Sequence, residues 1–272
     1  MLWYRIDPIS ILTRKSFMNS STIASIIKSK GIEKVVALAI SDFPTAQLAQ
    51  DAGIDLILVG DSLGMVTLGL SNTTQVDIDM IVHHTKAVSR SQGKALIVAD
   101  LPFPGVAEDF EKILQKATQL LRAGAGAIKI EGGSTEAIEK IERLINAGIP
   151  IIGHLGLLPQ KVQTLGGYRQ FGKTGAEIKL LKAQAKSLQK AGIFALVLEM
   201  VVASVANEIT EILSIPTIGI GSGQNTDGQI LVSHDLLGLT EGKIPSFVKP
   251  MAKLKNTILK TFRAYQKEVR NS

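Results

Sequence analysis

The chain has 272 residues, of which 45% are hydrophobic and 20% charged, a composition that can bury a sizeable core and is unlike that of disordered or fibrous proteins. It has no cysteine, which excludes disulfides, cysteine-based zinc sites and a thiol nucleophile, and is compatible with a reducing cytoplasm. The net charge is +6, but the cations are scattered, aromatic residues are only 4% and no apolar run reaches about 18 residues, so we expect no nucleic-acid or membrane partner.

Residues 1–19 are predicted to be an N-terminal extension, disordered or partly helical. They lack the apolar stretch and cleavage site of a secretory signal. Arg5, Arg14 and Lys15 leave an organellar targeting segment as an alternative, although Asp7 and the short length count against it. No Gly/Pro/Ser-rich linker divides the rest, so residues 20–272 are predicted to form one catalytic domain.

Eight short apolar segments have the character of strands that are buried on both faces. In chain order they are 35–40, 55–59, 95–100, 127–130, 150–152, 195–198, 217–221 and 230–234. An Ala-Gly pair that suits a helix end precedes four of them: Ala52-Gly53, Ala123-Gly124, Ala147-Gly148 and Ala191-Gly192. Helical spacing marks residues 106–122 and 177–190, and a further helix is predicted at 248–268.

The alternation of strands and helices predicts a parallel α/β architecture. Eight such units in roughly 250 residues favour a single (β/α)8 TIM barrel over an open doubly wound sheet. We expect the C-terminal helix to pack on the outside of this barrel.

Five successive strands end in ionisable residues, and barrels build their active sites at the C-terminal ends of their strands. Charged residues are rarely buried without a partner or a metal, so packing does not explain the pattern. The residues are Asp61 with Ser62, Asp100, Lys129 with Glu131, His154 and Glu199.

Three carboxylates, Asp61, Asp100 and Glu131, predict a Mg²⁺ site, because Mg²⁺ prefers oxygen ligands. The alternative is that one or two of them, Glu131 in particular, only pair with Lys129 in the barrel mouth. A small 2-keto acid could chelate the metal, which would act as a Lewis acid and stabilise an enolate. Glu199, further round the barrel, is the candidate base for the proton next to the carbonyl.

The four histidines are less informative. His154 could bind substrate or relay a proton, or could be structural. His83 and His84 are interpreted as surface or packing residues, and His234 with Asp235 at the eighth strand could have either role. The glycine-rich run 219–223 follows the seventh strand, where barrels often bind phosphate, but a glycine-rich turn is a weak signal.

Several motifs together resemble the ketopantoate hydroxymethyltransferase family. They span residues 20–250 in the family's order and are specific in combination. They are Val59-Gly60-Asp61-Ser62-Leu63-Gly64, Asp100-Leu101-Pro102-Phe103, Lys129-Ile130-Glu131-Gly132-Gly133, Gly153-His154-Leu155-Gly156-Leu157 with Pro159-Gln160, Gly166-Gly167-Tyr168, Gly219-Ile220-Gly221, Asp227–Val232 and His234-Asp235.

The resemblance implies transfer of a hydroxymethyl group from 5,10-methylenetetrahydrofolate to 3-methyl-2-oxobutanoate, which gives 2-dehydropantoate for pantothenate and coenzyme A synthesis. It also implies a homodecamer of two pentameric rings. We expect the protein to be cytoplasmic. By the matching motifs, Asp61, Asp100 and Glu131 would bind Mg²⁺, while Asp61, Ser62, Asp100 and Lys129 would contact the keto acid. Glu199 would accept the proton, and His154 would line the pocket.

Two departures from the family pattern lie beside these residues. Ile40-Ser41-Asp42 stands where the family usually has Ala-Tyr-Asp, which alters one wall of the pocket. Met200-Val201-Val202 stands where Cys-Val-Pro is usual, and loss of the proline frees the backbone beside Glu199. Neither change removes a proposed chemical group, so we expect an active enzyme.

Two other functions stay open at this point. One is a different Mg²⁺-dependent keto-acid barrel of the isocitrate lyase and phosphoenolpyruvate mutase type, although the lyases generally carry a cysteine motif that this chain lacks. The other is a barrel without catalytic activity, against which the intact set of ionisable strand ends counts.

Overall fold

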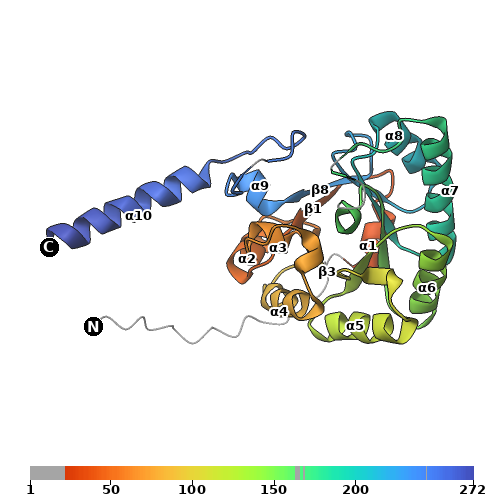
Figure 1. Ribbon diagram of the computed structural model, residues 1–272, viewed down its shortest axis with the longest axis horizontal. Coiled ribbons are helices and arrows are strands. Elements are labelled where there is room, and N and C mark those ends of the chain that lie inside the picture. The colour runs from red at the N-terminus through yellow and green to blue at the C-terminus, as the bar shows by residue number, and fades with distance from the viewer. Residues whose placement is uncertain (1–21, 163–165, 168, 243) are drawn as a thin grey trace.

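Eight parallel strands close into a barrel in the computed structural model, which describes residues 22–162, 166–167, 169–242 and 244–272 (Figure 1). Each strand pairs with its neighbours in chain order, and β1 closes the barrel against β8. The strands are β1 (Val35–Ala39), β2 (Leu56–Val59), β3 (Leu96–Asp100), β4 (Ala127–Glu131), β5 (Ile151–Gly156), β6 (Ala195–Glu199), β7 (Thr217–Ile220) and β8 (Gly228–Val232). The predicted TIM barrel is therefore confirmed.

Helices surround the barrel and connect most of its strands (Figure 1). The loop 221–227 between β7 and β8, which the structure describes throughout, contains no helix. The α-helices are α1 (Ile23–Lys28), α2 (Phe43–Asp51), α3 (Leu63–Val66), α4 (Ile78–Val88), α5 (Phe110–Arg122), α6 (Thr135–Asn146), α7 (Gly175–Ala191), α8 (Ala203–Ile212), α9 (Ser233–Leu237) and α10 (Leu254–Asn271). Three short 3₁₀ turns are η1 (Thr73–Gln75), η2 (Gly105–Ala107) and η3 (Pro159–Lys161).

The four Ala-Gly pairs end helices as predicted. Gly53, Gly124, Gly148 and Gly192 have φ angles of 78°, 106°, 87° and 100°, which is the left-handed region that glycine adopts without strain. At the other end of several helices, a short polar side chain accepts a backbone N–H of the first turn, as Asp42 does from Thr45 at 2.9 Å. Local chemistry therefore fixes where these helices begin and end.

Apolar residues fill two regions, one between the sheet and the helices and one inside the barrel. Alternation along each strand separates them, because successive side chains point to opposite faces. Val98 of β3 and Val197 of β6 belong to the inner cluster, and the next inward position along each strand is Asp100 or Glu199. The strand period thus directs these carboxylates into the mouth of the barrel.

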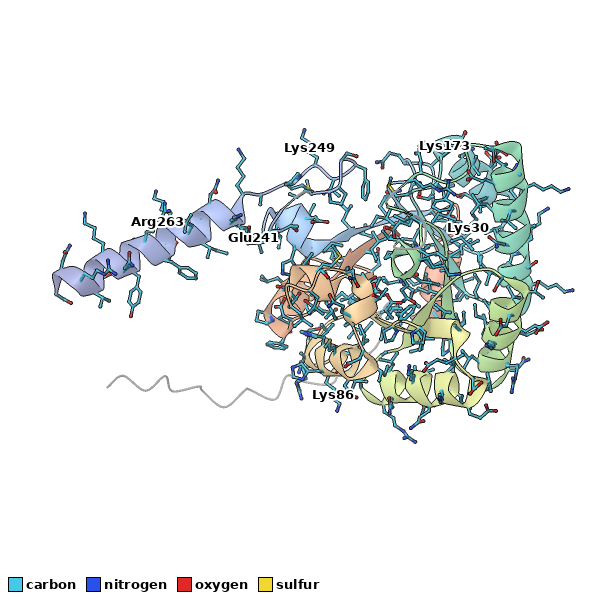
Figure 2. All side chains as sticks on the ribbon, in the orientation of Figure 1. Lys30, Lys86, Lys173, Glu241, Lys249 and Arg263 are labelled. Atoms are coloured by element: carbon cyan, nitrogen blue, oxygen red, sulfur yellow. The ribbon has the colours of Figure 1, made fainter. Side chains whose placement is uncertain are left out.

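The C-terminal helix α10 does not pack on the barrel, so that prediction is wrong. It extends away from the domain, and its side chains are exposed from Lys255 to Asn271 (Figures 1 and 2). Its apolar side chains, such as Phe262 at 66% and Tyr265 at 68% exposure, have no surface of their own barrel to cover. The helix itself is present where predicted, but it begins at Leu254 and not at residue 248.

No helix in the described residues is long and apolar enough to span a membrane. Residues 1–19, predicted to be an extension, lie outside the described residues, so that prediction stays a prediction. Tyr168 of the Gly166-Gly167-Tyr168 motif also lies outside them.

Candidate active site

The ionisable residues predicted from the strand ends gather at one end of the barrel. Asp100, Lys129, Glu131 and His154 lie within strands β3, β4 and β5, and Glu199 is the last residue of β6. Strand pairing places Lys129 beside Asp100 and His154 beside Glu131. Residues that are far apart in sequence are thus brought together by the closure of the barrel.

A buried lysine lies among the carboxylates. Lys129 Nζ donates to Asp100 Oδ2 at 2.8 Å and lies 3.5 Å from Glu131 Oε1. Asp61, which follows β2, donates its backbone N–H to Asp100 Oδ2 at 3.3 Å. Lys129 and the three carboxylates are buried, so these interactions act in a low effective dielectric.

The pKa values of the four groups reflect a negatively charged cluster with one cation. Burial, and then the charge of Asp100, hold the pKa of Asp61 well above its usual value. The pKa of Asp100 is raised too, because the cost of burial outweighs the effect of Lys129. Burial opposes the charge on Lys129, but its carboxylate neighbours prevail and raise its pKa. The pKa of Glu131 is lowered, because Lys129 and His154 outweigh burial.

His154 connects this cluster to Glu199. Its Nδ1 lies 3.4 Å from Glu131 Oε1 and its Nε2 lies 3.3 Å from Glu199 Oε2. Neither contact has hydrogen-bond alignment, and both ring nitrogens are otherwise unpartnered. Burial and the charge of Lys129 disfavour the protonated ring, but the two carboxylates outweigh them and raise the pKa of His154 to about 9. The ring therefore lies between two glutamates that favour its protonated form.

The backbone of Glu199 packs closely against Gly156 and Leu157 at the end of β5. The backbone N–H of Leu157 donates to the carbonyl oxygen of Glu199 at 2.8 Å, and the preceding Gly156 pairs with Glu199 in the sheet. Gly156 has a φ of 98°, and a Cβ there would lie 2.1 Å from the Glu199 carbonyl oxygen. Only glycine allows the two strands to approach this closely.

Gln160 belongs to this site, although the sequence pattern offered no reason to assign it a role. It lies in η3, and its side-chain Nε2 donates to Asp61 Oδ2 and to the carbonyl oxygen of Leu101, both at 3.1 Å. Its backbone N–H also contributes to lowering the pKa of Glu131. Gln160 occurs in the Pro159-Gln160 motif, but neutral amides lack the strand-end charge pattern that revealed the others.

The donor set fits a hard divalent cation. Asp100 Oδ1 and Glu131 Oε2 are buried without a hydrogen-bond partner in the protein, although buried polar atoms normally have one. Within the described residues, no three acidic or histidine side chains are arranged to hold a metal ion by themselves. Mg²⁺ commonly uses one or two carboxylates and completes its shell with water and substrate, and the site offers this number of free oxygens.

The remaining candidates lie at the edge of this cluster. Ser62 lines a small hollow beside α3, together with Ser41 and His234. His84 Nδ1 contacts the carbonyl oxygen of Ser41 at 2.6 Å, so His84 supports the end of β1, in agreement with its interpretation as a packing residue. Ser222, in the glycine-rich run after β7, hydrogen-bonds to β6 next to Glu199.

A model of the ketopantoate hydroxymethyltransferase family matches residues 20–272. The chain belongs to this family. The motifs that carried the resemblance supply Asp61, Asp100, Lys129, Glu131 and His154 of the barrel mouth and also Gly156, so the ketopantoate hydroxymethyltransferase signature and the geometry coincide at these residues.

Named relatives in the ketopantoate hydroxymethyltransferase family match the chain over most of its length. The 3-methyl-2-oxobutanoate hydroxymethyltransferase of Thermotoga neapolitana is 51% identical over 243 residues, covering 89% of this chain and 90% of its own. The protein of the same name from Staphylothermus marinus is 46% identical over 254 residues, covering 93% of each chain. The chain therefore corresponds to nearly the whole of these proteins.

Solved structures with a similar fold are much more distant in sequence. A phosphoenolpyruvate phosphomutase from Streptomyces platensis subsp. rosaceus superposes with a TM-score of 0.62 at 12% identity, covering 92% of this chain and 88% of its own. A phosphonopyruvate hydrolase gives the same TM-score and identity, with 93% and 88% covered. At this identity the similarity concerns the fold alone, so it does not favour the mutase or lyase alternative over the family's own activity.

Proposed function

We propose that the chain catalyses hydroxymethyl transfer from 5,10-methylenetetrahydrofolate to 3-methyl-2-oxobutanoate, giving 2-dehydropantoate, with Mg²⁺ as the metal. The observation that carries the proposal is the buried cluster of Asp61, Asp100, Lys129 and Glu131 facing Glu199 in a chain of this family. A 2-keto acid has two adjacent oxygens and an acidic C–H bond, which matches a site that combines free carboxylate oxygens, a cation and a base.

Asp61, Asp100 and Glu131 would hold Mg²⁺, with the two unpartnered oxygens of Asp100 and Glu131 as the first candidates. Bound Mg²⁺ would supply a Lewis acid that polarises the keto oxygen and acidifies the neighbouring C–H bond. Lys129 offsets the negative charge of these carboxylates and of the substrate carboxylate, which would otherwise repel each other. Ser62, beside Asp61, would contact the substrate carboxylate.

Glu199 is the proposed base. Its side chain is 16% exposed, more than those of Asp100, Lys129, Glu131 and His154, so a substrate can reach it. It would take the proton from C3 of the keto acid. Water would cleave both C–N bonds of the methylene bridge of the folate, which releases tetrahydrofolate and a one-carbon unit at the aldehyde level. The C3 carbanion would add to that carbon to form the new C–C bond, and the resulting alkoxide would take up a proton to become the hydroxyl group. His154 lies between Glu131 and Glu199, at 3.4 and 3.3 Å from their carboxylate oxygens, and attraction between its ring and these carboxylates would help to direct the base.

Exchange of the C3 proton of 3-methyl-2-oxobutanoate in D₂O, followed by NMR with and without Mg²⁺, tests the proposal before any folate is added. We expect exchange that depends on the metal, and 2-dehydropantoate once 5,10-methylenetetrahydrofolate is supplied. The Glu199→Gln variant should lose about 10²–10⁴-fold in exchange rate while binding Mg²⁺ and keto acid nearly normally. Glu208→Gln is the matched control, because Glu208 pairs with Lys182 on the outer surface.

Three outcomes would contradict parts of this function. Exchange at the wild-type rate in Glu199→Gln would refute the role of Glu199 as the base. Metal-dependent exchange without product on folate addition would keep the keto-acid chemistry but exclude the proposed second substrate. An Asp100→Ala variant with unchanged Mg²⁺-dependent binding of the keto acid would remove Asp100 from the metal site.

We also propose that the protein assembles with itself, as the homodecamer of two pentameric rings that the family resemblance implies. Helix α10 supports self-association, because Ile258, Phe262, Tyr265 and Val269 recur at helical spacing and all are exposed. Most of the stability of a helix in a protein comes from packing of its apolar face, so a partner surface would stabilise α10. Mass photometry should give ten-chain particles, and removal of residues 254–272 should shift them to smaller species. A monomeric full-length protein would refute assembly.

The proposed compartment is the cytoplasm. The absence of cysteine supports a protein that does not depend on an oxidising compartment. Fluorescence microscopy of the full chain carrying a C-terminal tag should show diffuse cytoplasmic signal, and an organellar signal would favour the targeting alternative for residues 1–19.

A further inference from the structure

The backbone immediately after Glu199 adopts an unusual conformation. Met200 has a φ of 52°, and no other non-glycine residue in the described part of the chain has a positive φ. This left-handed conformation is strained for a residue with a side chain, so surrounding contacts must maintain it. Because Met200 follows Glu199 directly, the same contacts set the direction in which the Glu199 side chain leaves β6.

The side chain of Ser222 supplies two of these contacts, one on each side of Glu199 and Met200. Its hydroxyl donates to the carbonyl oxygen of Leu198 at 2.7 Å and accepts the backbone N–H of Val201 at 2.9 Å. Ser222 is 1% exposed, so water does not compete for these bonds. The hydroxyl thus joins the residue before Glu199 to the residue after Met200.

Glycines on both sides allow Ser222 to approach β6 this closely. A Cβ at Gly221 would lie 2.8 Å from Met200 Sδ, and a Cβ at Gly223 would lie 2.6 Å from the Cβ of Ala203. Both glycines also have a positive φ, 61° and 82°. The Gly-Ser-Gly sequence after β7 therefore fits a turn that presses one hydroxyl against the end of β6.

The pairing between β6 and β7 does not supply another acceptor for the backbone N–H of Val201. Regular pairing ends where Glu199 faces Ile220, and the next N–H, that of Met200, donates to the carbonyl oxygen of Ile220 at 2.9 Å. Val201 leaves the ladder with β7 and forms a bridge with Phe171, and its own N–H has the Ser222 hydroxyl as its acceptor. Without that hydroxyl, the buried N–H of Val201 would lack a partner two residues after Glu199, which is unfavourable.

We propose that Ser222 is a positioning residue for Glu199, a role that rests on the proposed function of Glu199 as the base. Ser222 holds the backbone on both sides of the base and keeps Met200 left-handed, so that the Glu199 carboxylate stays within reach of the substrate C–H bond. It touches neither the substrate nor the metal candidates.

Ser222→Ala is the direct test, with Ser91→Ala as its matched control. Ser91 is also buried, its hydroxyl donates to the carbonyl oxygen of Val88 at 2.7 Å and accepts Gln50 Nε2 at 3.3 Å, and it lies after α4, away from Glu199. We expect Ser222→Ala to lower the kcat of C3 proton exchange by about 10- to 100-fold, because displacement of a reacting group by 1 Å has an effect of this order. The KM of the keto acid, and its Mg²⁺-dependent affinity measured by calorimetry, should stay within about twofold. Ser91→Ala should exchange at the wild-type rate.

A double variant shows whether Ser222 acts through Glu199. In the Glu199→Gln background there is no base to position, so Ser222→Ala should cause no further loss of exchange. A further loss equal to that in the wild-type background would overturn the proposal, as would unchanged exchange in Ser222→Ala alone. If Glu199→Gln itself exchanges normally, the proposed base fails and the positioning role fails with it. If Glu199→Gln exchanges slowly as expected but Ser222→Ala is fully active, only the positioning role is refuted.

Ser222→Cys keeps the test decisive if Ser222→Ala does not fold. A thiol is a weak donor and acceptor in the same position, so exchange should fall to a rate between those of the wild type and Glu199→Gln. A folded Ser222→Cys with wild-type kcat would overturn the role of the hydroxyl.

Discussion

Replacement of Gly156 by alanine should displace Glu199 and separate catalysis from substrate binding. The new Cβ would start 2.1 Å from the Glu199 carbonyl oxygen and 2.8 Å from Val201 Cγ2, both far below van der Waals contact. The end of β6 must therefore shift by roughly 1 Å, and a misplacement of that size can cost about 10²-fold in rate. Binding of Mg²⁺ and keto acid should change little, because Asp61 and Ser62 follow β2, and Asp100, Lys129 and Glu131 lie on β3 and β4.

The effect on stability has two parts that a control can separate. Alanine at a left-handed position costs about 1–2 kcal/mol, and overpacking adds about 1–3 kcal/mol. Gly148→Ala isolates the first part, because Gly148 has a φ of 87° and a Cβ there would meet no atom within 4 Å. At roughly 2–4 °C per kcal/mol, the melting temperature of Gly156→Ala should fall clearly further than that of Gly148→Ala.

The assay is C3 proton exchange in D₂O, with calorimetry for substrate affinity. We expect Gly148→Ala to exchange normally and Gly156→Ala to exchange about 100-fold more slowly, with keto-acid affinity retained in both. Equal exchange rates in the two folded variants would refute the reasoning that Gly156 sets the position of Glu199.

Two further predictions concern the metal-free protein, kept free of Mg²⁺ by a chelator. Lys129→Met should lose about 3–5 kcal/mol of unfolding free energy, because it leaves buried carboxylates without their cation. Urea unfolding measures this loss, and a loss below about 1 kcal/mol would contradict the ion-pair assignment. Asp61→Asn should be more stable than the wild type near neutral pH. The folded protein holds the Asp61 proton more tightly than the unfolded chain, so the wild type loses stability as the pH rises above the usual aspartate value of 3.8. The advantage of Asp61→Asn should therefore shrink as the pH falls towards about 4, and urea unfolding that finds the same advantage at pH 5 and pH 8 would contradict the raised pKa.

The fold was predictable because strand and helix signals repeat along the chain. The apolar segments and the Ala-Gly pairs located all eight strands to within a few residues, and family membership agrees with the motifs. The apolar pattern predicts a fifth strand that ends at Ile152, which is too short, because β5 continues through His154 to Gly156. Gly153 and Gly156 look like turn residues in the sequence, but here they admit close neighbours within the sheet.

The site was predictable only where it carries charge. Asp100, Lys129 and Glu131 stand out because a charge at the end of an apolar strand needs an explanation. Gln160 and Ser222 act through hydrogen bonds to residues about 100 and 20 positions away, and a single sequence contains no local trace of such pairing. The packing of α10 was misjudged for a related reason, because amphipathic spacing shows that a helix has an apolar face but not which chain covers it.

The crowding of carboxylates around Lys129 limits how this protein can evolve. Selection for robustness favours any substitution that relieves buried like charges, yet each such substitution at Asp61, Asp100 or Glu131 removes a group on which the proposed chemistry depends. Lineages under thermal pressure must therefore accumulate compensating changes elsewhere, in helix faces, caps and subunit contacts, while the mouth of the barrel stays fixed. Divergence between relatives should accordingly be greatest on the outer layer and smallest at these strand ends.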